Sequence, residues 1–335
     1  MSYENVIGEV HLEILENGSP ENTDRKFSGD SDSLASAVRA YRQGSFSRNR
    51  AMTFSPDAPA NAPTILVWDH LTVTTQIKGG GTKTLIDDIS GAITGGFWAI
   101  MGPSGGGKTT LLSTLSLRLD PSKMNISGDV TLNGNTYEKN DLKAMSGYVM
   151  QDDLLHADLT VQETLDYTAK LRLSKTISIE ERASRISEVM ELVGITHVKD
   201  VIVGDTRRKG ISGGERKRLC ISMELLGRPA LLFLDEPTSG LDSFTSLSVC
   251  SALKTLATLG VCTVVCTIHQ PQHKIFDLFD NLILMKKGSI VFQGASKKAL
   301  LFFDAVGQKM PDGANPADFL IQMISSDEEV KEEDI

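Results

Sequence analysis

The chain has 335 residues, of which 40% are hydrophobic and 23% are charged, a composition that is typical of folded globular proteins and excludes fibrous and collagen-like classes. Its 43 acidic residues outnumber its 34 basic residues, which gives a formal net charge of −9. The acidic excess lies mostly near the two ends of the chain. The middle therefore lacks the basic character that nucleic-acid binding requires, and we expect no nucleic-acid partner.

No apolar stretch approaches the roughly 20 residues that a membrane-spanning helix needs. The longest apolar runs, such as Leu231–Leu234 and Val261–Ile268, are short and indicate buried strands. The sequence therefore predicts that this chain is soluble and has no transmembrane segment.

The N-terminal part of the chain is rich in Ser, Asn, Asp and Arg and runs into a proline-rich segment, Ser55–Pro63. Prolines at this density favour an extended linker over a packed core. We therefore expect a disordered tail and linker over residues 1–63 and a folded domain over residues 64–323. Residues 324–335 are expected to form an acidic tail or linker.

Strands and helices alternate through the folded region. Ile65–Val73 and the Gly79-Gly80-Gly81 turn indicate a hairpin, and Phe97–Met101 is an apolar strand that runs into a glycine-rich turn. The later elements are a helix over Thr109–Leu119, helices over 161–193, a helix after Ser212, a strand over Leu231–Leu234, a helix over Leu247–Leu259 and a strand over Val261–Thr267. This alternation predicts an α/β fold with a mainly parallel sheet covered on both faces, and the middle helices indicate a separate lobe.

Residues 102–109, which read Gly-Pro-Ser-Gly-Gly-Gly-Lys-Thr, match the pattern of a phosphate-binding loop between a strand and a helix. Glycines let successive backbone N–H groups turn toward one point, and the N-terminus of the following helix adds its positive end. Lys108 then supplies a charge for the β- and γ-phosphates, and the Thr109 hydroxyl is placed to bind Mg²⁺. The predicted nucleotide-binding residues of this segment are Gly102, Pro103, Ser104, Gly105, Gly106, Gly107, Lys108, Thr109 and Thr110.

A second apolar strand ends in two acids, Asp235 and Glu236. In open α/β sheets, charges at the carboxyl ends of the strands face the crevice where ligands bind. We expect Asp235 to hold Mg²⁺ through its water shell. Glu236 is expected to act as the general base that polarises the attacking water.

The segment Ile211–Glu215 has two interpretations. Ser212 and Glu215, three residues apart, form a capping box that opens a helix. A plain cap does not need both Gly213 and Gly214, and two glycines behind a serine at a helix N-terminus also make an anion-binding surface. One γ-phosphate cannot easily be bound by both helix ends of the same chain, whereas a second copy that faces the first would supply the other end.

The order of the phosphate loop, the Asp235-Glu236 pair and the Ser212 motif resembles that of the ATP-binding cassette of ABC proteins, over about Ile65–Met323. The resemblance implies a P-loop NTPase fold of the RecA-like type, with an antiparallel β subdomain and an inserted helical subdomain at about residues 152–228. It also implies a homodimer or heterodimer of two cassettes that enclose two ATP and Mg²⁺. In that arrangement, the serine–glycine signature of one cassette closes over ATP held by the other.

Further residues match motifs of this family. Gln151 matches the Q-loop glutamine, for which the resemblance implies contact with Mg²⁺ and a role in reporting nucleotide to a membrane domain. Asp242 matches the D-loop, and His269 matches the switch histidine that contacts the γ-phosphate. The resemblance thus implies the catalytic residues Glu236, His269 and Gln151, the metal ligands Thr109, Gln151 and Asp235, and nucleotide contacts by Ser212, Gly213, Gly214, Glu215 and Asp242.

Glu215, where most ABC proteins have glutamine, and the Arg216-Lys217-Arg218 run that follows it resemble the G, or White, subfamily. Ile268–Pro271 and Asn315–Phe319 resemble motifs of the same subfamily. Half-transporters of this type place the cassette before the membrane domain. The resemblance therefore implies the cytosolic half of a membrane transporter, with the membrane domain C-terminal to this chain. The implied function is ATP hydrolysis that powers transmembrane export of a lipid-like or other small hydrophobic substrate.

A soluble ABC ATPase that acts on ribosomes or DNA without transport is the alternative. The missing membrane helices favour it, whereas the single cassette, the nearly neutral core and the G-subfamily motifs oppose it.

One departure from the family concerns the binding of the nucleotide base. The aromatic residue on which many ABC proteins stack adenine falls near Thr75, which cannot stack, so the sequence does not predict selectivity for ATP over GTP.

Overall fold

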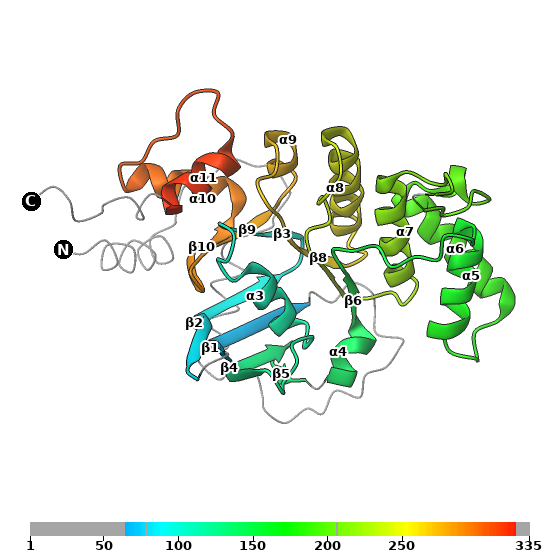
Figure 1. The fold of residues 1–335 in the computed structure, drawn as a ribbon, viewed down its shortest axis with the longest axis horizontal. Coiled ribbons are helices and arrows are strands. Elements are labelled where there is room, and N and C mark those ends of the chain that lie inside the picture. The colour runs from blue at the N-terminus through cyan, green and yellow to red at the C-terminus, as the bar shows by residue number, and fades with distance from the viewer. Residues whose placement is uncertain (1–63, 78–79, 138, 206, 326–335) are drawn as a thin grey trace, which may run out of the picture.

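The computed structural model describes residues 64–77, 80–137, 139–205 and 207–325 (Figure 1). The predicted tail over residues 1–63 and residues 326–335 of the predicted acidic tail lie outside this range, as does the first glycine of the Gly79-Gly80-Gly81 turn. Within the described ranges, no helix combines the length and the apolar character that crossing a membrane requires.

The first strands form a four-stranded antiparallel sheet with the order β2-β1-β4-β5. Its members are β1 (Ile65–Gln76), β2 (Thr82–Thr94), β4 (Met124–Leu132) and β5 (Asn135–Thr136). The predicted hairpin is confirmed as β1 and β2, which pair from Ile65 opposite Thr94 to Gln76 opposite Thr82. We did not predict β4, because its residues Asn125–Asp129 are exposed and mostly polar and lack the alternation of a half-buried strand.

The remaining strands build a six-stranded sheet with the order β10-β9-β3-β8-β7-β6. Its members are β3 (Phe97–Met101), β6 (Ser146–Val149), β7 (Leu231–Leu234), β8 (Thr263–Thr267), β9 (Asn281–Lys286) and β10 (Ser289–Ala295). β3 pairs in parallel with β8 and β9, and β7 pairs in parallel with β6 and β8. The edge strand β10 runs antiparallel to β9. The predicted α/β fold with a mainly parallel sheet is therefore confirmed.

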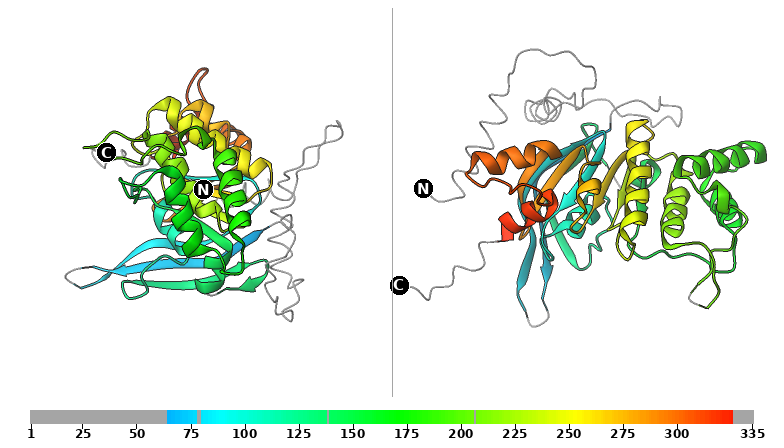
Figure 2. Two further views of the ribbon diagram at one scale, coloured as in Figure 1. Left: turned by 90° about the vertical axis from the view of Figure 1, so that its right-hand side faces the viewer. Right: turned by 90° about the horizontal axis from the view of Figure 1, so that it is seen from above.

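Helices lie on both sides of this sheet, with α3 on one side and α8 and α9 on the other (Figures 1 and 2). The helices are α3 (Lys108–Leu115), α4 (Lys139–Met145), α5 (Val161–Arg172), α6 (Ile179–Val193), the 3-10 helix η1 (Thr196–Val198), α7 (Gly213–Leu225), α8 (Ser243–Thr258), α9 (His273–Phe276), α10 (Ser296–Ala305) and α11 (Pro316–Ser325). α5, α6 and α7 form a helical lobe beside β6, within the predicted span of residues 152–228. The predicted apolar face of α6 is confirmed, because its buried residues are Ile186, Val189, Met190 and Val193.

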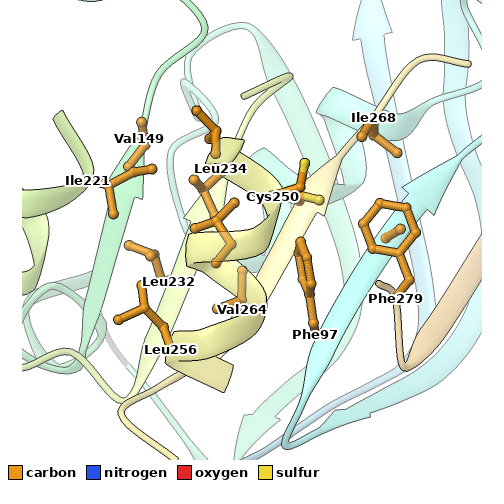
Figure 3. Packing of buried hydrophobic residues seen from close by; sticks show 14 of the residues in the cluster. Phe97, Val149, Ile221, Leu232, Leu234, Cys250, Leu256, Val264, Ile268 and Phe279 are labelled. Carbon is orange, nitrogen blue, oxygen red and sulfur yellow. The ribbon is translucent and has the colours of Figure 1, made fainter. Parts of the chain in front are cut away.

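Two hydrophobic cores lie on opposite faces of the six-stranded sheet, because successive strand residues point to opposite faces. In β3, Phe97, Ala99 and Met101 belong to the larger core, whereas Trp98 and Ile100 belong to the smaller one. The larger core packs the sheet against α5 to α11, and Figure 3 shows Phe97 among residues of β7, β8 and α8. The smaller core packs the sheet against α3 and the antiparallel sheet. The loop that follows β3 is thus anchored between both cores.

Two predicted helix boundaries differ from the structure. α3 stops at Leu115, earlier than predicted, because Leu117 turns to a positive φ of 52° that a helix cannot continue through. α8 begins at Ser243, earlier than the predicted Leu247, because the Asp242 side chain caps its N-terminus.

Candidate nucleotide-binding site

The phosphate loop, Gly102–Gly107, joins β3 to α3 as predicted, and Lys108 opens α3, followed by Thr109 and Thr110. The Lys108 side chain is buried, and its Nζ donates hydrogen bonds to the carbonyls of the first two loop residues, both at 3.0 Å. Burial lowers the pKa of Lys108, and the two carboxylates that follow β7 oppose this shift. The loop therefore closes around a buried positive charge.

The phosphate loop requires glycine where it meets β9 and the turn that follows it. Gly102 has a φ of 153°, and a Cβ there would lie 2.1 Å from the carbonyl oxygen of Met285. Gly107, at a φ of 100°, is the left-handed N-cap of α3. The N–H of Gly288 donates to the carbonyl of Gly106 at 3.0 Å and fastens the turn to the loop. We did not predict this support, because the two segments are far apart in the sequence.

The carboxyl ends of β7 and β8 bring a network of hydroxyl and carboxylate groups to the start of α3. The hydroxyls of Thr109 and Thr267 donate to Asp235 Oδ1, at 3.1 and 2.6 Å. Thr267 Oγ1 also accepts the backbone N–H of Glu236, at 2.9 Å. Thr109 and Asp235 thus lie together, as predicted. Thr267, which is fully buried, was missed, although a threonine that ends an apolar strand at this edge was a usable signal.

Glu236, Gln151 and His269 follow three neighbouring parallel strands, β7, β6 and β8. Gln151 Nε2 donates to Glu236 Oε2 at 3.0 Å and to Ser239 Oγ at 3.4 Å. His269 Nε2 lies 3.4 Å from the hydroxyl of Ser104 in the phosphate loop. Glu236 has a φ of 44°, a conformation that is costly for a residue with a side chain and is concentrated at functional sites. The structure thus brings the three predicted catalytic residues to one edge of the sheet.

The N-terminus of α7 is closed by its own residues. Ser212 Oγ accepts the N–H of Glu215 at 3.3 Å, and Glu215 Oε2 accepts the N–H and the hydroxyl of Ser212 at 2.7 and 2.8 Å, which confirms the capping box. His197 Nε2 lies 3.1 Å from Glu215 Oε1. Partial burial raises the pKa of Glu215, but the hydrogen bonds from Ser212 and His197 outweigh this effect and lower it overall. Among the described residues, none of these contacts reaches the phosphate loop, and α7 lies in the helical lobe, away from α3 (Figure 1).

The two glycines at the start of α7 pack against the segment that leads into α8. A Cβ on Gly214 would lie 2.2 Å from Thr245 Cγ2, and one on Gly213 would lie 3.0 Å from Leu241 Cδ2. Asp242 caps α8, because its carboxylate accepts the N–H and the hydroxyl of Thr245, at 3.0 and 2.6 Å. Both glycines therefore have a packing reason, the close approach of α7 to this segment, that the sequence did not reveal.

The Asn315–Phe319 motif begins α11 and reaches the segment that follows His269. The amide nitrogen of its asparagine donates to the carbonyl of Pro271 at 3.0 Å. Gln270, between His269 and Pro271, has a positive φ of 40°. The start of α11 therefore supports the backbone turn that carries His269, a role that its use as a subfamily marker did not suggest.

These groups fit a nucleotide with Mg²⁺. The Thr109 hydroxyl and the Asp235 carboxylate are hard oxygen donors of the kind that Mg²⁺ prefers, and they lie 3.1 Å apart. Lys108 and the N-terminus of α3 place positive charge where phosphates would bind. A phosphate loop of this kind, with an acid pair on a neighbouring strand of a mainly parallel sheet and a separate signature helix, defines a P-loop ATPase of the ATP-binding cassette class.

Comparisons with known proteins agree with this class. The ABC transporter family model matches residues 87–239, and the ABC-2 type transporter family model matches residues 269–333. The chain belongs to the ABC transporter family, in its G subfamily.

Three relatives illustrate the similarity. ABC transporter G family member 1 of Dictyostelium discoideum is 45% identical over 248 residues, which cover 73% of this chain and 31% of the relative. The broad substrate specificity ATP-binding cassette transporter ABCG2 of Rattus norvegicus is 42% identical over 269 residues, which cover 78% of this chain and 40% of the relative. Protein scarlet of Drosophila melanogaster is 41% identical over 300 residues, which cover 88% of this chain and 45% of the relative. The chain thus spans less than half the length of these curated relatives.

Solved structures share the fold. cbiO1 from Clostridium perfringens, described as part of the ABC transporter complex cbiONQ, aligns with a TM-score of 0.60 and 23% identity, over 73% of this chain and 94% of that chain. The bacterial cassette MJ0796, in a structure described as dimeric, aligns with a TM-score of 0.56 and 23% identity, over 69% of this chain and 98% of that chain. The P-loop NTPase fold predicted from the sequence is therefore confirmed.

One expectation was wrong. Because no long apolar stretch is present, we expected a chain that is soluble and placed the membrane domain wholly outside it. The ABC-2 type transporter match over residues 269–333 contradicts this interpretation, since part of the chain belongs to a membrane-transporter family. The described part of this segment folds as short elements, α9 to α11 with β9 and β10, many of whose apolar residues are buried in the two cores. A search for long apolar stretches could not detect such a match.

Proposed function

We propose that this chain binds ATP at the phosphate loop and hydrolyses it within a dimer of two cassettes, and that hydrolysis powers transmembrane export of a lipid-like or other small hydrophobic substrate. One observation carries the proposal. The candidate catalytic groups meet at one edge of the parallel sheet, whereas the signature serine caps α7 in another part of the same chain. A site that includes both therefore needs a second cassette.

The phosphate loop supports nucleotide binding. Lys108 Nζ, which bonds to two loop carbonyls, would exchange them for β- and γ-phosphate oxygens, and the N–H groups of Gly105–Gly107 and of the first turn of α3 would hold the same phosphates. Thr109 and Asp235 would hold Mg²⁺, with Gln151 as a further ligand. When bound, Mg²⁺ supplies positive charge to the phosphate oxygens. Because Thr109 donates to Asp235, each of these two groups orients the other.

The groups around Glu236 support hydrolysis. Glu236 would polarise the attacking water as a general base within hydrogen-bond reach. The amide of Gln151 orients its carboxylate, and Thr267 holds its backbone N–H. His269, beside Ser104, would contact the γ-phosphate. Catalysis of this kind consists mainly of positioning and charge stabilisation, which a set of mutually bonded side chains provides.

The start of α7 would complete the site of the opposing cassette. Ser212, Gly213, Gly214 and Glu215 would face the γ-phosphate held by the partner, with Asp242 beside them. The Ser212 hydroxyl, which donates to Glu215 at 2.8 Å, would turn to a phosphate oxygen, and the helix end would add its positive charge. The similar cassette MJ0796 is described as dimeric. Bound ATP would then hold the dimer closed, and hydrolysis would loosen it.

Movement of the dimer would reach a membrane domain near Gln151. Met150 and Leu154, which flank Gln151, expose 43% and 73% of their surface although both are apolar, and they offer a contact for a partner. The ABC-2 type transporter match and the similarity to the transporter ABCG2 support transport. Neither favours the alternative of an ABC ATPase that acts on ribosomes or DNA.

Nucleotide-dependent association of the Glu236→Gln chain tests the dimer. This variant should keep ATP bound, so we expect dimers in sedimentation velocity with MgATP and monomers with MgADP or without nucleotide. A chain that stays monomeric with MgATP would contradict the proposal. Adding Ser212→Arg should return the Glu236→Gln chain to monomers. A dimer that survives this change would remove Ser212 from the interface.

Transport is tested in membrane vesicles that contain this cassette together with its membrane domain. We expect ATP-dependent accumulation of a fluorescent phospholipid inside inverted vesicles, and its loss in the Glu236→Gln variant. Accumulation that is the same in both would contradict a role for hydrolysis in export. If ATPase activity is intact but neither this phospholipid nor small apolar dyes accumulate, the proposed substrate class is contradicted.

A further inference from the structure

A buried lysine of α7 contacts the segment that carries Gln151. Lys217 is only 2% exposed, and its Nζ donates to the carbonyls of Met150 at 3.3 Å and Gln151 at 2.9 Å. Its third partner is the carboxylate of Asp153, 2.6 Å away. The ammonium thus donates two hydrogen bonds to backbone carbonyls and forms an ion pair with Asp153.

A buried charge at this position requires a reason. Burying an ammonium is costly even when it is well paired, and an apolar side chain of similar size would often fill the space with equal or greater stability. The neighbouring basic residues bond elsewhere, since Arg216 donates to carbonyls of the helical lobe and Arg218 donates to Ser248 of α8. Of these three residues, Lys217 is the one that reaches Gln151.

This contact joins two segments that serve different nucleotides in the proposed dimer. Gln151 Nε2 donates to Glu236 and therefore belongs to the site of its own phosphate loop. Ser212 caps the helix that carries Lys217 and would belong to the site of the partner. Because α7 is one continuous helix over Gly213–Leu225, a shift of its N-terminus moves Lys217 with it.

We propose that Lys217 is a positioning residue that couples the two ATP sites of the dimer by holding the backbone of Gln151 to the signature helix. When Ser212 engages the nucleotide of the partner, α7 carries the Gln151 carbonyl with it and sets the Gln151 side chain against Glu236. Asp153 keeps the ammonium in place. This inference rests on the proposed function, because it needs two cassettes that share two nucleotides.

The test measures the steady-state ATPase rate of the full chain against ATP concentration, for the wild type and for Lys217→Met. The wild type should have a Hill coefficient above one. Lys217→Met should lower this coefficient to one and kcat by about tenfold, which corresponds to roughly 1.4 kcal/mol. The affinity of dilute chains for a fluorescent ATP analogue should not change. Lys175→Met, which alters an exposed lysine of the same lobe, should keep the wild-type values.

A second variant separates positioning from folding. Lys217→Met leaves the largely buried Asp153 without its partner and should lower Tm, whereas Lys217→Met with Asp153→Asn removes both charges and should recover most of Tm. The double variant should keep the low kcat and the Hill coefficient of one, because methionine cannot donate to the Gln151 carbonyl. Recovery of kcat and cooperativity together with Tm would overturn the proposal. An unchanged Hill coefficient in Lys217→Met would also overturn it.

The wild-type chain distinguishes this failure from a failure of the proposed function. An ATPase rate strictly proportional to chain concentration would mean that no second cassette is needed, and would overturn both. A rate that rises more steeply than chain concentration, with the same cooperativity in wild type and Lys217→Met, would overturn the role of Lys217 alone.

Discussion

The two helices that begin with glycine-rich motifs make different contacts at their N-termini. At α3, the phosphate loop closes around Lys108, and groups from other elements converge on it, with Asp235 bonded to the start of the helix and His269 beside the loop. At α7, Ser212 and Glu215 form a capping box with each other. The phosphate loop thus meets charged side chains from other elements of the chain, whereas the start of α7 meets few.

A glycine-rich helix start therefore does not define a site by itself. The phosphate loop becomes a site because parallel strands deliver carboxylates and a histidine to the same edge of the sheet. The start of α7 has a capping box and a close packing contact, and in the proposed dimer its chemistry depends on the second cassette that faces it. Substitutions at the two helix starts should therefore have different consequences.

The largest expected effect on ATPase activity comes from the same substitution at two serine caps. Ser178 caps α6 as Ser212 caps α7, since each accepts the N–H of a glutamate three residues later. Ser212→Arg and Ser178→Arg should each lower the free energy of unfolding by about 1 kcal/mol. ATPase activity should be lost only in Ser212→Arg, because an arginine there blocks the approach of a second cassette.

Nucleotide binding by dilute single chains, measured by fluorescence, should stay normal in both serine variants. Weakened binding by Ser212→Arg alone would favour capping as the whole role of Ser212. Equal loss of activity in both variants would mean that the two helix ends are equivalent.

Glu236→Gln tests the site at the phosphate loop. It should keep ATP binding but lower turnover on the order of 10²-fold or more, as the loss of other single catalytic groups does. Phosphate release measures this effect, and Glu191→Gln, on an exposed glutamate of α6, is the matched control. Near-normal turnover would remove Glu236 from its role.

Thr267→Val tests whether the network around Asp235 supports the site. The valine can neither donate to Asp235 nor accept the N–H of Glu236, so the buried groups left unpaired should lower the free energy of unfolding by about 1–3 kcal/mol. The Mg²⁺ concentration needed for half-maximal ATPase activity should rise roughly tenfold. Thr263→Val, at the other end of the same strand, should leave this requirement unchanged. Equal Mg²⁺ requirements in the two variants would contradict the role of Thr267.

The smallest expected effect concerns the pH dependence of the cap at α7. The pKa of Glu215 is lowered in the folded chain, so its ionised form stabilises the fold above the usual glutamate pKa of 4.5, and this contribution is lost as the pH falls through the lowered pKa. Glu215→Gln should therefore lose less stability than the wild type on acidification, by under about 1 kcal/mol because the group is partly exposed. Parallel curves of unfolding free energy against pH would contradict this assignment.

Local motifs could be predicted because each is complete within a short stretch of sequence. The β3–loop–α3 unit, the capping box at Ser212 and the acids after β7 all lie where the sequence places them. Contacts between distant segments could not be predicted. Met285 meets the loop only after β9 pairs with β3. Lys217 lies in a charge run that indicates a solvated helix face, yet it is buried.

The same limit applies to the fold. Alternating strands and helices predict a parallel sheet, but the order β10-β9-β3-β8-β7-β6 depends on pairings between strands that are remote in the sequence. The mostly polar strand β4 and the edge strand β10 carry weak patterns of their own. Their positions follow from the neighbours with which they pair.

The most direct measurement is the steady-state ATPase rate of the purified chain as a function of its own concentration, with Glu236→Gln as the blank. We expect a rate that rises more steeply than chain concentration and is absent in the blank, because each phosphate loop needs the Ser212 motif of a second chain. A strictly proportional rate would mean that each chain hydrolyses ATP alone, and would contradict the proposed role of α7 in the site of an opposing cassette.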